Sequence, residues 1–193
     1  MIDTENFITS TLKQFAYYKS LGDKSFAQLS EEDLFAQPNQ QSNSISIIVN
    51  HMHGNMMSRW TDFLATDGEK DFRKRDQEFE PVIKTAEEMH RKWEEGWQTV
   101  MDAIETLTPE NIDTIIYIRN IGHSVVEAVQ RQLCHYAYHV GQIVFYAKIL
   151  KEDQTFQSLS ISKGDSKKYN QEKFAKAKSR GHFTDQYLDA KKD

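Results

Sequence analysis

The chain has few residues that break regular structure: 193 residues include only eight glycines and three prolines. So few breakers leave room for few turns, which excludes a many-stranded sandwich or barrel, because those folds need a turn roughly every 8–12 residues. An aromatic content of 11% is too high for a disordered chain. We therefore expect an all-α protein built from a small number of long helices.

Cysteine and long apolar runs are also scarce. Cys134 is the sole cysteine, which excludes an internal disulfide and a zinc or iron–sulfur site built on cysteines. No apolar run approaches the roughly 18 residues that a membrane-spanning helix needs. The first residues, MIDTENF, have neither the basic region nor the apolar stretch of a signal peptide. We expect a cytoplasmic protein without a membrane partner.

Positive charge is the scarcer sign, with 24 Lys and Arg against 29 Asp and Glu and a net charge of −5. This balance argues against a protein that binds nucleic acid. The distribution is uneven, because residues 151–193 carry ten basic and seven acidic side chains. We interpret residues 1–155 as one domain and residues 156–193 as a basic C-terminal extension, partly packed and partly flexible.

Four long segments place apolar residues at helical spacing. They run from Thr4 to about Leu21 with a possible continuation to Leu29, from Ser44 to about Ala65, from Thr85 to Leu107, and from Ser124 to Leu150. Thr85 and Ser124 each have a glutamate three residues later, the pattern of a capping box. A shorter helix start lies at Ser30, which three acidic residues follow. The four long segments predict a four-helix bundle with long crossover loops.

Two connections between these segments stand out. Residues 66–82 form a long loop with charges of both signs, and a loop of that length inside a compact domain usually has a functional role. Residues 112–119, with the sequence IDTIIYIR, are interpreted as a short extended piece.

Histidines give the clearest chemical signal, because His135 and His139 lie four residues apart in the last long segment. On a helix this spacing puts both rings on one face with their Cβ atoms about 5–6 Å apart, which suits two imidazoles that bind one ion. Surface histidines also occur at this spacing by chance, so the pair alone is weak support. The pair lies at the edge of an apolar stripe, however, and bundles build metal sites between such facing helices.

A third ligand would come from the second long segment, which offers His51 and His53. At about 100° of rotation per residue, His53 points about 60° from the centre of the apolar stripe and His51 about 140° from it. Burial alone therefore favours His53. The side of the predicted helix toward which His51 points forms a polar stripe that includes Asn55, Arg59 and Asp62.

The polar stripe beside His51 has a counterpart in the last segment, formed by Arg131, Gln142 and Tyr146. Two such stripes facing each other would enclose a polar cleft. The same residues would also be explained by simple exposure to solvent, and periodicity does not choose between the two interpretations.

Two segments together carry a resemblance to a known family: residues 43–80, which contain NSISIIVNHMHGN, and residues 131–143, RQLCHYAYHVGQI. They resemble the DinB/YfiT superfamily of metal-dependent proteins, most closely a bacterial subgroup of unknown function, and the likeness covers most of residues 5–170. It implies an antiparallel four-helix bundle whose metal is held by one histidine on helix two and two on helix four. In the family an apolar residue follows the helix-two ligand, so the implied ligands are His51, His135 and His139, with His53 as the alternative.

Three imidazoles suit a divalent ion such as Zn, Ni, Cu or Fe, and they leave positions for water or substrate. An ion bound in this way lowers the pKa of bound water to around 7 and deprotonates a bound thiol. The resemblance implies enzymes that transfer low-molecular-weight thiols to electrophiles, and relatives that act on thiol conjugates. We therefore expect a metal-dependent transferase or hydrolase with a small-molecule substrate, its identity left open.

The residues expected around the metal fall into two groups. Arg59 and Arg131 are candidates to hold an anionic substrate, and the pocket or the hydrogen bonds to the ligands would also involve Asn55, Asp62, Gln142 and Tyr146. The resemblance further implies a homodimer. Two alternatives remain: a metal-binding protein without turnover, and a helical dimerisation or stress-response protein that binds no metal.

Two glycines lie inside predicted helices beside the proposed ligands, Gly54 after His51 and Gly141 after His139. A glycine inside a helix costs about 1 kcal/mol relative to alanine. Their positions therefore predict a close approach between helices or room for a ligand.

Overall fold

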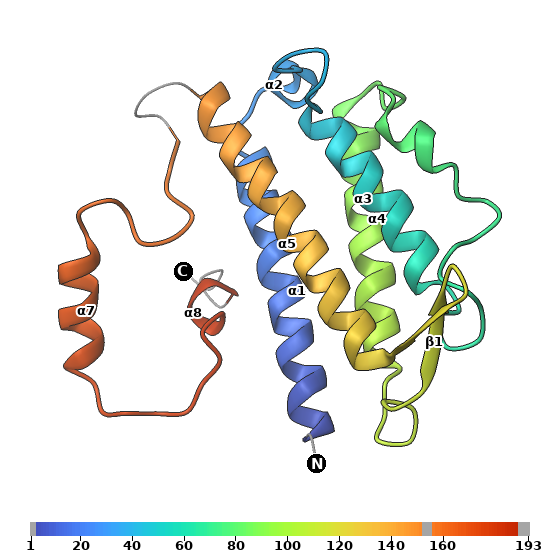
Figure 1. The fold of residues 1–193 in the computed structure, drawn as a ribbon. Helices are drawn as coiled ribbons and strands as arrows, with labels where there is room; N and C mark the ends of the chain where they lie inside the picture. Colours follow the sequence, from blue (N-terminus) through green and yellow to red (C-terminus); the bar gives the residue numbers. More distant parts are fainter. Residues whose placement is uncertain (1–2, 152–155, 189–193) are drawn as a thin grey trace.

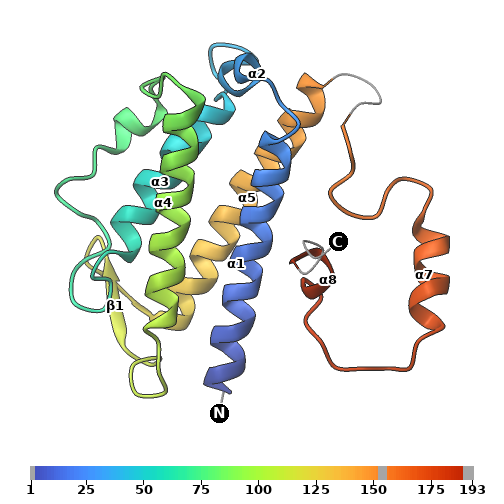
Figure 2. The same cartoon turned by 180° about the vertical axis from the view of Figure 1, so that it is seen from behind.

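The computed structural model describes residues 3–151 and 156–188, which are mostly helical and include one small two-stranded sheet. Four long helices lie side by side and form the body of the protein (Figures 1 and 2): α1 (Thr4–Phe26), α3 (Ile45–Trp60), α4 (Ala86–Glu105) and α5 (Val125–Leu150). The expectation of a mostly helical protein is confirmed, and the sheet goes beyond an all-α class.

The long helices begin at the polar residues that the sequence offers as caps. Before α5, the Ser124 hydroxyl accepts from the N–H of Glu127, and the Glu127 carboxylate accepts from the N–H of Ser124 at 2.7 Å. Before α4, Thr85 accepts from the N–H of Glu88 at 3.1 Å, but the Glu88 carboxylate accepts from the N–H of Lys84 instead. The capping box predicted at Thr85 is therefore only half formed.

Short elements connect the long helices. Ser30 caps α2 (Glu31–Phe35), and the loop after α3 contains the 3-10 helix η1 (Arg75–Phe79). Strands β1 (Ile115–Ile118) and β2 (Ile121–Ser124) pair antiparallel. Arg119 and Asn120 both have positive φ angles in the two-residue turn, the conformation that matches the twist of a hairpin. Of the extended piece predicted at residues 112–119, residues 115–118 form the first strand of this hairpin, whereas residues 112, 113 and 119 lie in turns.

Helix α3 ends at Trp60, five residues before the predicted end at Ala65. Thr61 leaves the helical conformation with a ψ of 122°, and Asp62 has a φ of 47°. Asp62 therefore does not continue the polar face of the helix, and its side chain is exposed.

Aromatic side chains fill the centre of the core. Trp93, Trp97, Tyr136 and Phe15 are almost completely buried, and the rings of Trp97 and Tyr136 meet edge to face with centroids 5.6 Å apart. Trp60 is buried as well. The tryptophans are therefore core residues.

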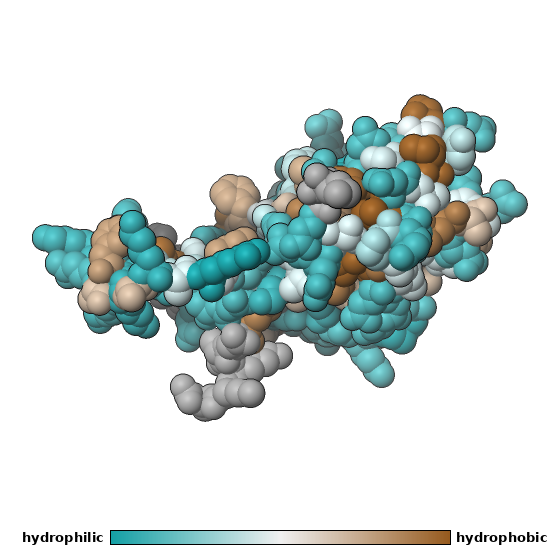
Figure 3. Space-filling view, turned by 90° about the horizontal axis from the view of Figure 1, so that it is seen from below, coloured by the Kyte–Doolittle hydropathy of each residue, from teal (hydrophilic) through white to brown (hydrophobic). Residues whose placement is uncertain are grey.

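The C-terminal segment has two short helices, α7 (Ser166–Phe174) and α8 (Asp185–Leu188). Helix α8 packs against α1, where Lys13 forms an ion pair with Asp185 at 2.7 Å and the Tyr17 ring contacts Tyr187. Helix α7 lies away from the four long helices, and Figure 3 shows mainly hydrophilic residues over this projecting part. No helix among the described residues is long and apolar enough to cross a membrane.

Candidate functional site

Three histidines from two helices converge on one point between α3 and α5. The Nε2 atom of His135 lies 3.3 Å from Nε2 of His51 and 3.1 Å from Nε2 of His139. One nitrogen from each ring lies within 4.8 Å of the others, an arrangement that could hold a metal ion. His51 and His139 are buried, and His135 is partly exposed.

The outer nitrogens of two of these rings have their own partners. Nδ1 of His51 donates to the Glu78 carboxylate at 2.9 Å, and Nδ1 of His139 donates to the side-chain oxygen of Gln142 at 2.8 Å. A neutral imidazole with its proton on Nδ1 has a free lone pair on Nε2. Both rings therefore direct a lone pair at the shared point. Gln142 was a predicted candidate for this role.

Glu78 reaches His51 because the loop after α3 folds back along the helix. Its position in η1 is fixed by Asn50, whose side-chain amide donates to the backbone carbonyl of Glu78 at 3.1 Å. The next residue, Phe79, stacks on the His51 ring with centroids 4.6 Å apart and an interplanar angle of 26°. The loop thus holds the ring of His51 from its face and from its edge.

Gly54 makes room for this contact. A Cβ atom at Gly54 would overlap the Glu78 carboxyl group, lying 2.8 Å from its Cδ atom. Gly54 therefore permits the close approach that the sequence predicted beside His51. A Cβ at Gly141 would meet nothing within 4 Å among the described residues, so the close approach predicted there is wrong, and the alternative of room for a ligand stays a prediction.

A second charged residue of the loop holds the Glu78 carboxylate. Arg73 donates from Nε to Oε1 at 2.7 Å and from its terminal nitrogen to Oε2 at 3.0 Å, and both side chains are buried. Burial raises the pKa of Glu78, but the hydrogen bonds from His51 and Arg73 outweigh it and hold the pKa below its ordinary value. The carboxylate therefore stays ionised beside His51.

Burial keeps two of the histidines neutral. It lowers the pKa of His135 to about 3, with a further contribution from the neighbouring His139 and His51 rings. Burial also lowers the pKa of His139 to about 4, against the opposing hydrogen bond to Gln142. Only a neutral imidazole has a lone pair for a metal, so these rings are in the ligating form at neutral pH.

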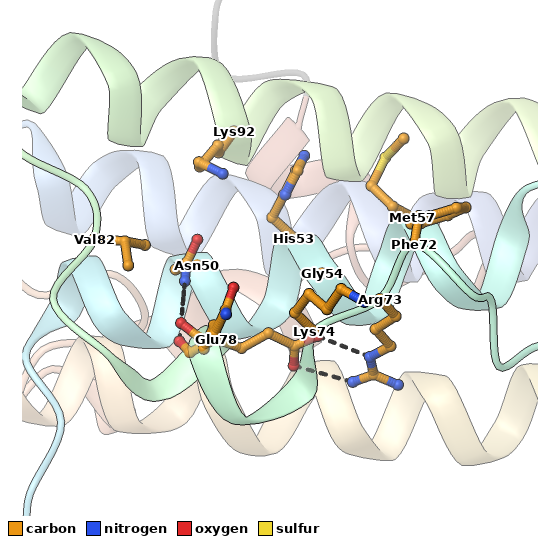
Figure 4. A pocket seen from close by; sticks show the side chains of 11 residues that line it. Asn50, His53, Gly54, Met57, Phe72, Arg73, Lys74, Glu78, Val82 and Lys92 are labelled. Carbon is orange, nitrogen blue, oxygen red and sulfur yellow. Dashed lines mark hydrogen bonds and ion pairs between the residues drawn. The ribbon is translucent and has the colours of Figure 1, made fainter.

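His53, the other candidate on α3, lies elsewhere. Its Nε2 contacts the Glu95 carboxylate of α4 at 3.1 Å, and it lines a separate pocket of about 460 Å³ together with Phe72 and Lys92 (Figure 4). The helical wheel pointed to His53 as the more buried of the two, and this is wrong. His51 is the more buried because the loop covers its side of α3.

The remaining predicted residues divide into two sets. Asn55, Arg59 and Arg131 line one pocket with His51 and His135. Asp62 lies beyond the end of α3 and lines a different cavity, and the Tyr146 hydroxyl donates to the carbonyl of Ala36 at 3.3 Å. The structure thus brings Asn55, Arg59 and Arg131 to the histidines and leaves Asp62 away from them.

A family model describes residues 3–165 of the chain as a protein of unknown function, DUF1572. The chain belongs to this family. The matched residues include all three converging histidines and the loop that carries Glu78. A comparison with curated proteins gave no match.

Sequence reasoning missed several residues of the site in this DUF1572 protein. Glu78, Phe79 and Arg73 come from the loop, and Gln132 of α5 lines the same pocket as His51 and His135. The length and the mixed charges of the loop were the available signal. They predicted a functional segment but not which of its residues faces a histidine.

Proposed function

We propose that this DUF1572 protein is a metal-dependent enzyme of the DinB/YfiT type, an antiparallel four-helix bundle with a divalent ion on His51, His135 and His139. The convergence of three Nε2 atoms on one point is the observation that carries the proposal. Zn, Ni and Fe are the leading candidates, because neutral imidazoles suit each of them.

The spacing of the nitrogens fits a metal ion. Nitrogen ligands at about 2.0–2.1 Å from a zinc ion are about 3.3–3.4 Å apart in a tetrahedral site. The contacts of 3.3 Å from His51 to His135 and 3.1 Å from His135 to His139 are close to this value. Glu78 and Gln142 hold the outer nitrogens, as carboxylate and amide partners do for metal-bound histidines.

Three protein ligands leave open positions for water or substrate, as in catalytic rather than structural zinc sites. The ion would supply a nucleophile at neutral pH by favouring the deprotonated form of a bound thiol or water. The chain's own residues would orient the reactants: Glu78 and Gln142 hold the rings, and the pocket beside His51 and His135 admits the substrate. A transferase acting on a low-molecular-weight thiol, or a hydrolase, is the proposed reaction class.

The first test is the metal content of the full chain purified without a histidine tag. We expect close to one equivalent of a divalent metal in the wild type, and a large loss in His51→Ala and His135→Ala. His53→Ala is the matched control on the same helix and should retain the metal. Negligible metal in the wild type, or loss in His53→Ala with retention in His51→Ala, would overturn the assignment.

The second test concerns turnover. Protein loaded with metal is incubated with low-molecular-weight thiols and a panel of electrophiles, and separately with thioester and amide substrates. Formation of thiol adducts identifies a transferase, and cleavage identifies a hydrolase. Stoichiometric metal with no reaction in either panel would favour a metal-binding protein without turnover.

We further propose that two copies of the chain pair through α5. Tyr138, Phe145 and Ile149 expose apolar side chains on this helix, and exposed Gly141 lies between them at helical spacing. An exposed apolar stripe of this kind is typical of an interaction surface.

A further inference from the structure

The pocket next to the histidines is lined by an unusual number of arginines. It has a volume of about 230 Å³ and opens beside His51 and His135. Its arginines come from four parts of the fold, namely α3, the loop before α4, the hairpin turn and α5: Arg59, Arg73, Arg75, Arg119 and Arg131. Five guanidinium groups from separate segments around one cavity concentrate positive charge at that point.

Two carboxylates partly balance this charge. Glu78 is held by Arg73, and Glu69 accepts from Arg59, Arg73 and Arg119. Within residues 3–151 and 156–188, neither Arg75 nor Arg131 forms an ion pair with a carboxylate. Arg75 lies over the Phe79 ring at 5.4 Å instead. The pocket therefore has an excess of positive charge before any metal binds.

Two buried side chains that line the pocket each have a polar atom without a hydrogen-bond partner among the described residues. These atoms are Nε of Arg59, whose residue is 7% exposed, and the side-chain oxygen of Gln132, whose residue is 3% exposed. A buried polar atom without a partner is unfavourable, because it has lost water and gained no hydrogen bond in return. One atom is a charged donor and the other is a neutral acceptor, so a ligand that satisfies both carries an acceptor and a donor.

We infer that this pocket binds an oxyanion of the substrate, a carboxylate or a phosphate, and that a neighbouring N–H or O–H group of the same molecule donates to Gln132. Planar guanidinium groups bind both kinds of oxyanion through paired hydrogen bonds. The volume is below the roughly 300–1,000 Å³ of a site for a drug-sized ligand, so a small anion or one end of a longer molecule fits. That this molecule is a substrate rests on the proposed function, whereas the binding of the anion does not.

Calorimetric titration of the full chain tests the inference, both as purified and after the metal has been removed by chelation and the chelator dialysed away. The probes are inorganic phosphate and succinate, and succinamide is the neutral control. We expect at least one of the two anions to bind with one site per chain while succinamide does not bind. Binding of phosphate alone or of succinate alone then identifies the oxyanion class.

Variants of exposed arginines locate the site. Arg75→Gln and Arg131→Gln should each weaken anion binding about tenfold or more, because each removes a charged hydrogen-bond donor from the pocket. Arg91→Gln is the control, since Arg91 is an exposed arginine of α4 outside the pocket. Equal affinities in Arg75→Gln, Arg131→Gln and the wild type would overturn the inference.

A charged substitution tests whether Gln132 lies at the binding site. Gln132→Glu adds a negative charge to the pocket and should weaken anion binding strongly through repulsion, whereas Gln130→Glu on the exposed side of the same helix should leave it unchanged. Circular dichroism checks that both variants fold. If Gln132→Glu folds and binds the anion as well as Gln130→Glu does, the assignment of this pocket is wrong.

Metal content of the same variants separates this inference from the proposed function. Arg75→Gln and Arg131→Gln should retain the metal of the wild type while their anion affinity falls. Anion binding by a chain that never contains metal would leave the inference standing and remove the proposed function. A chain that contains metal but binds neither phosphate nor succinate would overturn the inference and leave the proposed function standing.

Discussion

The Glu78 carboxylate accepts a hydrogen bond from Nδ1 of His51 at 2.9 Å, and both side chains are almost fully buried. This contact joins α3 to the loop that follows it. It fixes the proton of His51 on Nδ1, and Nε2 therefore faces His135 with a free lone pair. The proposed metal affinity thus depends on a residue that does not touch the metal.

Glu78→Gln should weaken metal binding about 10- to 100-fold, because a neutral amide makes His51 a less basic ligand. It also removes one of the two carboxylates that pair with the buried Arg73, so the free energy of unfolding should fall. Competition with a chromophoric chelator measures the affinity, after circular dichroism has confirmed the fold. Glu80→Gln, an exposed residue of the same loop, is the control. Equal affinities in the two variants would show that Glu78 does not tune the ligand.

The two mid-helix glycines should respond in opposite ways to alanine. Gly54→Ala places a methyl group against Glu78 and should weaken metal binding by displacing that carboxylate from His51. Gly141→Ala meets no neighbour within its own chain and should stabilise the single chain by about 1 kcal/mol through helix propensity. Chelator competition and urea unfolding measure the two effects. Unchanged metal affinity in Gly54→Ala would separate the glycine from the site.

The sequence predicts the starts of the long helices well because capping is local. Ser44, Thr85 and Ser124 lie where their hydroxyl groups meet the first exposed N–H groups of each helix. The end of α3 was missed, since Thr61 and Asp62 carry no glycine or proline signal. Their backbone turns out of the helix and begins the loop that returns along α3.

The loop after α3 also explains why helical periodicity failed to predict the burial of His51. Periodicity reports which face of a helix meets its neighbouring helices, and by that measure His51 points away from the core. The contact with Glu78, 27 residues later, buries it from the other side. A pairing of this kind depends on tertiary structure, and in this chain only the family resemblance indicated His51.

Two buried hydrogen bonds of the Tyr136 hydroxyl link Trp60 to Asn55, which lines the pocket beside the histidines. The hydroxyl accepts from the Trp60 indole at 3.0 Å and donates to the Asn55 side chain at 3.1 Å. Tyr136→Phe leaves both partners unpaired and should lower the free energy of unfolding by about 1–3 kcal/mol. Tyr138→Phe, an exposed residue of the same helix, should change it by less than about 0.5 kcal/mol. Similar urea midpoints for the two variants would contradict a stabilising role for the hydrogen bonds of Tyr136.

Asp67 links the loop to the hairpin and predicts a pH dependence of stability. Burial raises the pKa of its carboxyl, but backbone N–H donors of Asn120, Glu69 and Arg119 outweigh this and hold the pKa below the ordinary 3.8. The ionised form therefore favours the folded state above pH 3.8, and this contribution is lost as the pH falls through the lowered pKa.

Comparison of the wild type with Asp67→Asn tests this dependence. The wild type should be the more stable at pH 7, and the difference should shrink only in strong acid. Urea unfolding between pH 7 and pH 2.5 measures it. A difference that already disappears between pH 6 and pH 5 would assign it to another group.

Phe145→Glu should convert a homodimer into a monomer if α5 forms the interface. Phe145 is 67% exposed between Tyr138 and Ile149, so its replacement costs the single chain little stability. In a symmetric pair each copy would contribute the same stripe, so one substitution places a charge on both sides of the contact. Light scattering after size-exclusion chromatography should give the mass of two chains for the wild type and of one for Phe145→Glu. Phe72→Glu, an exposed phenylalanine on the loop after α3, should retain the mass of the wild type, and a wild type that is already monomeric would exclude the interface.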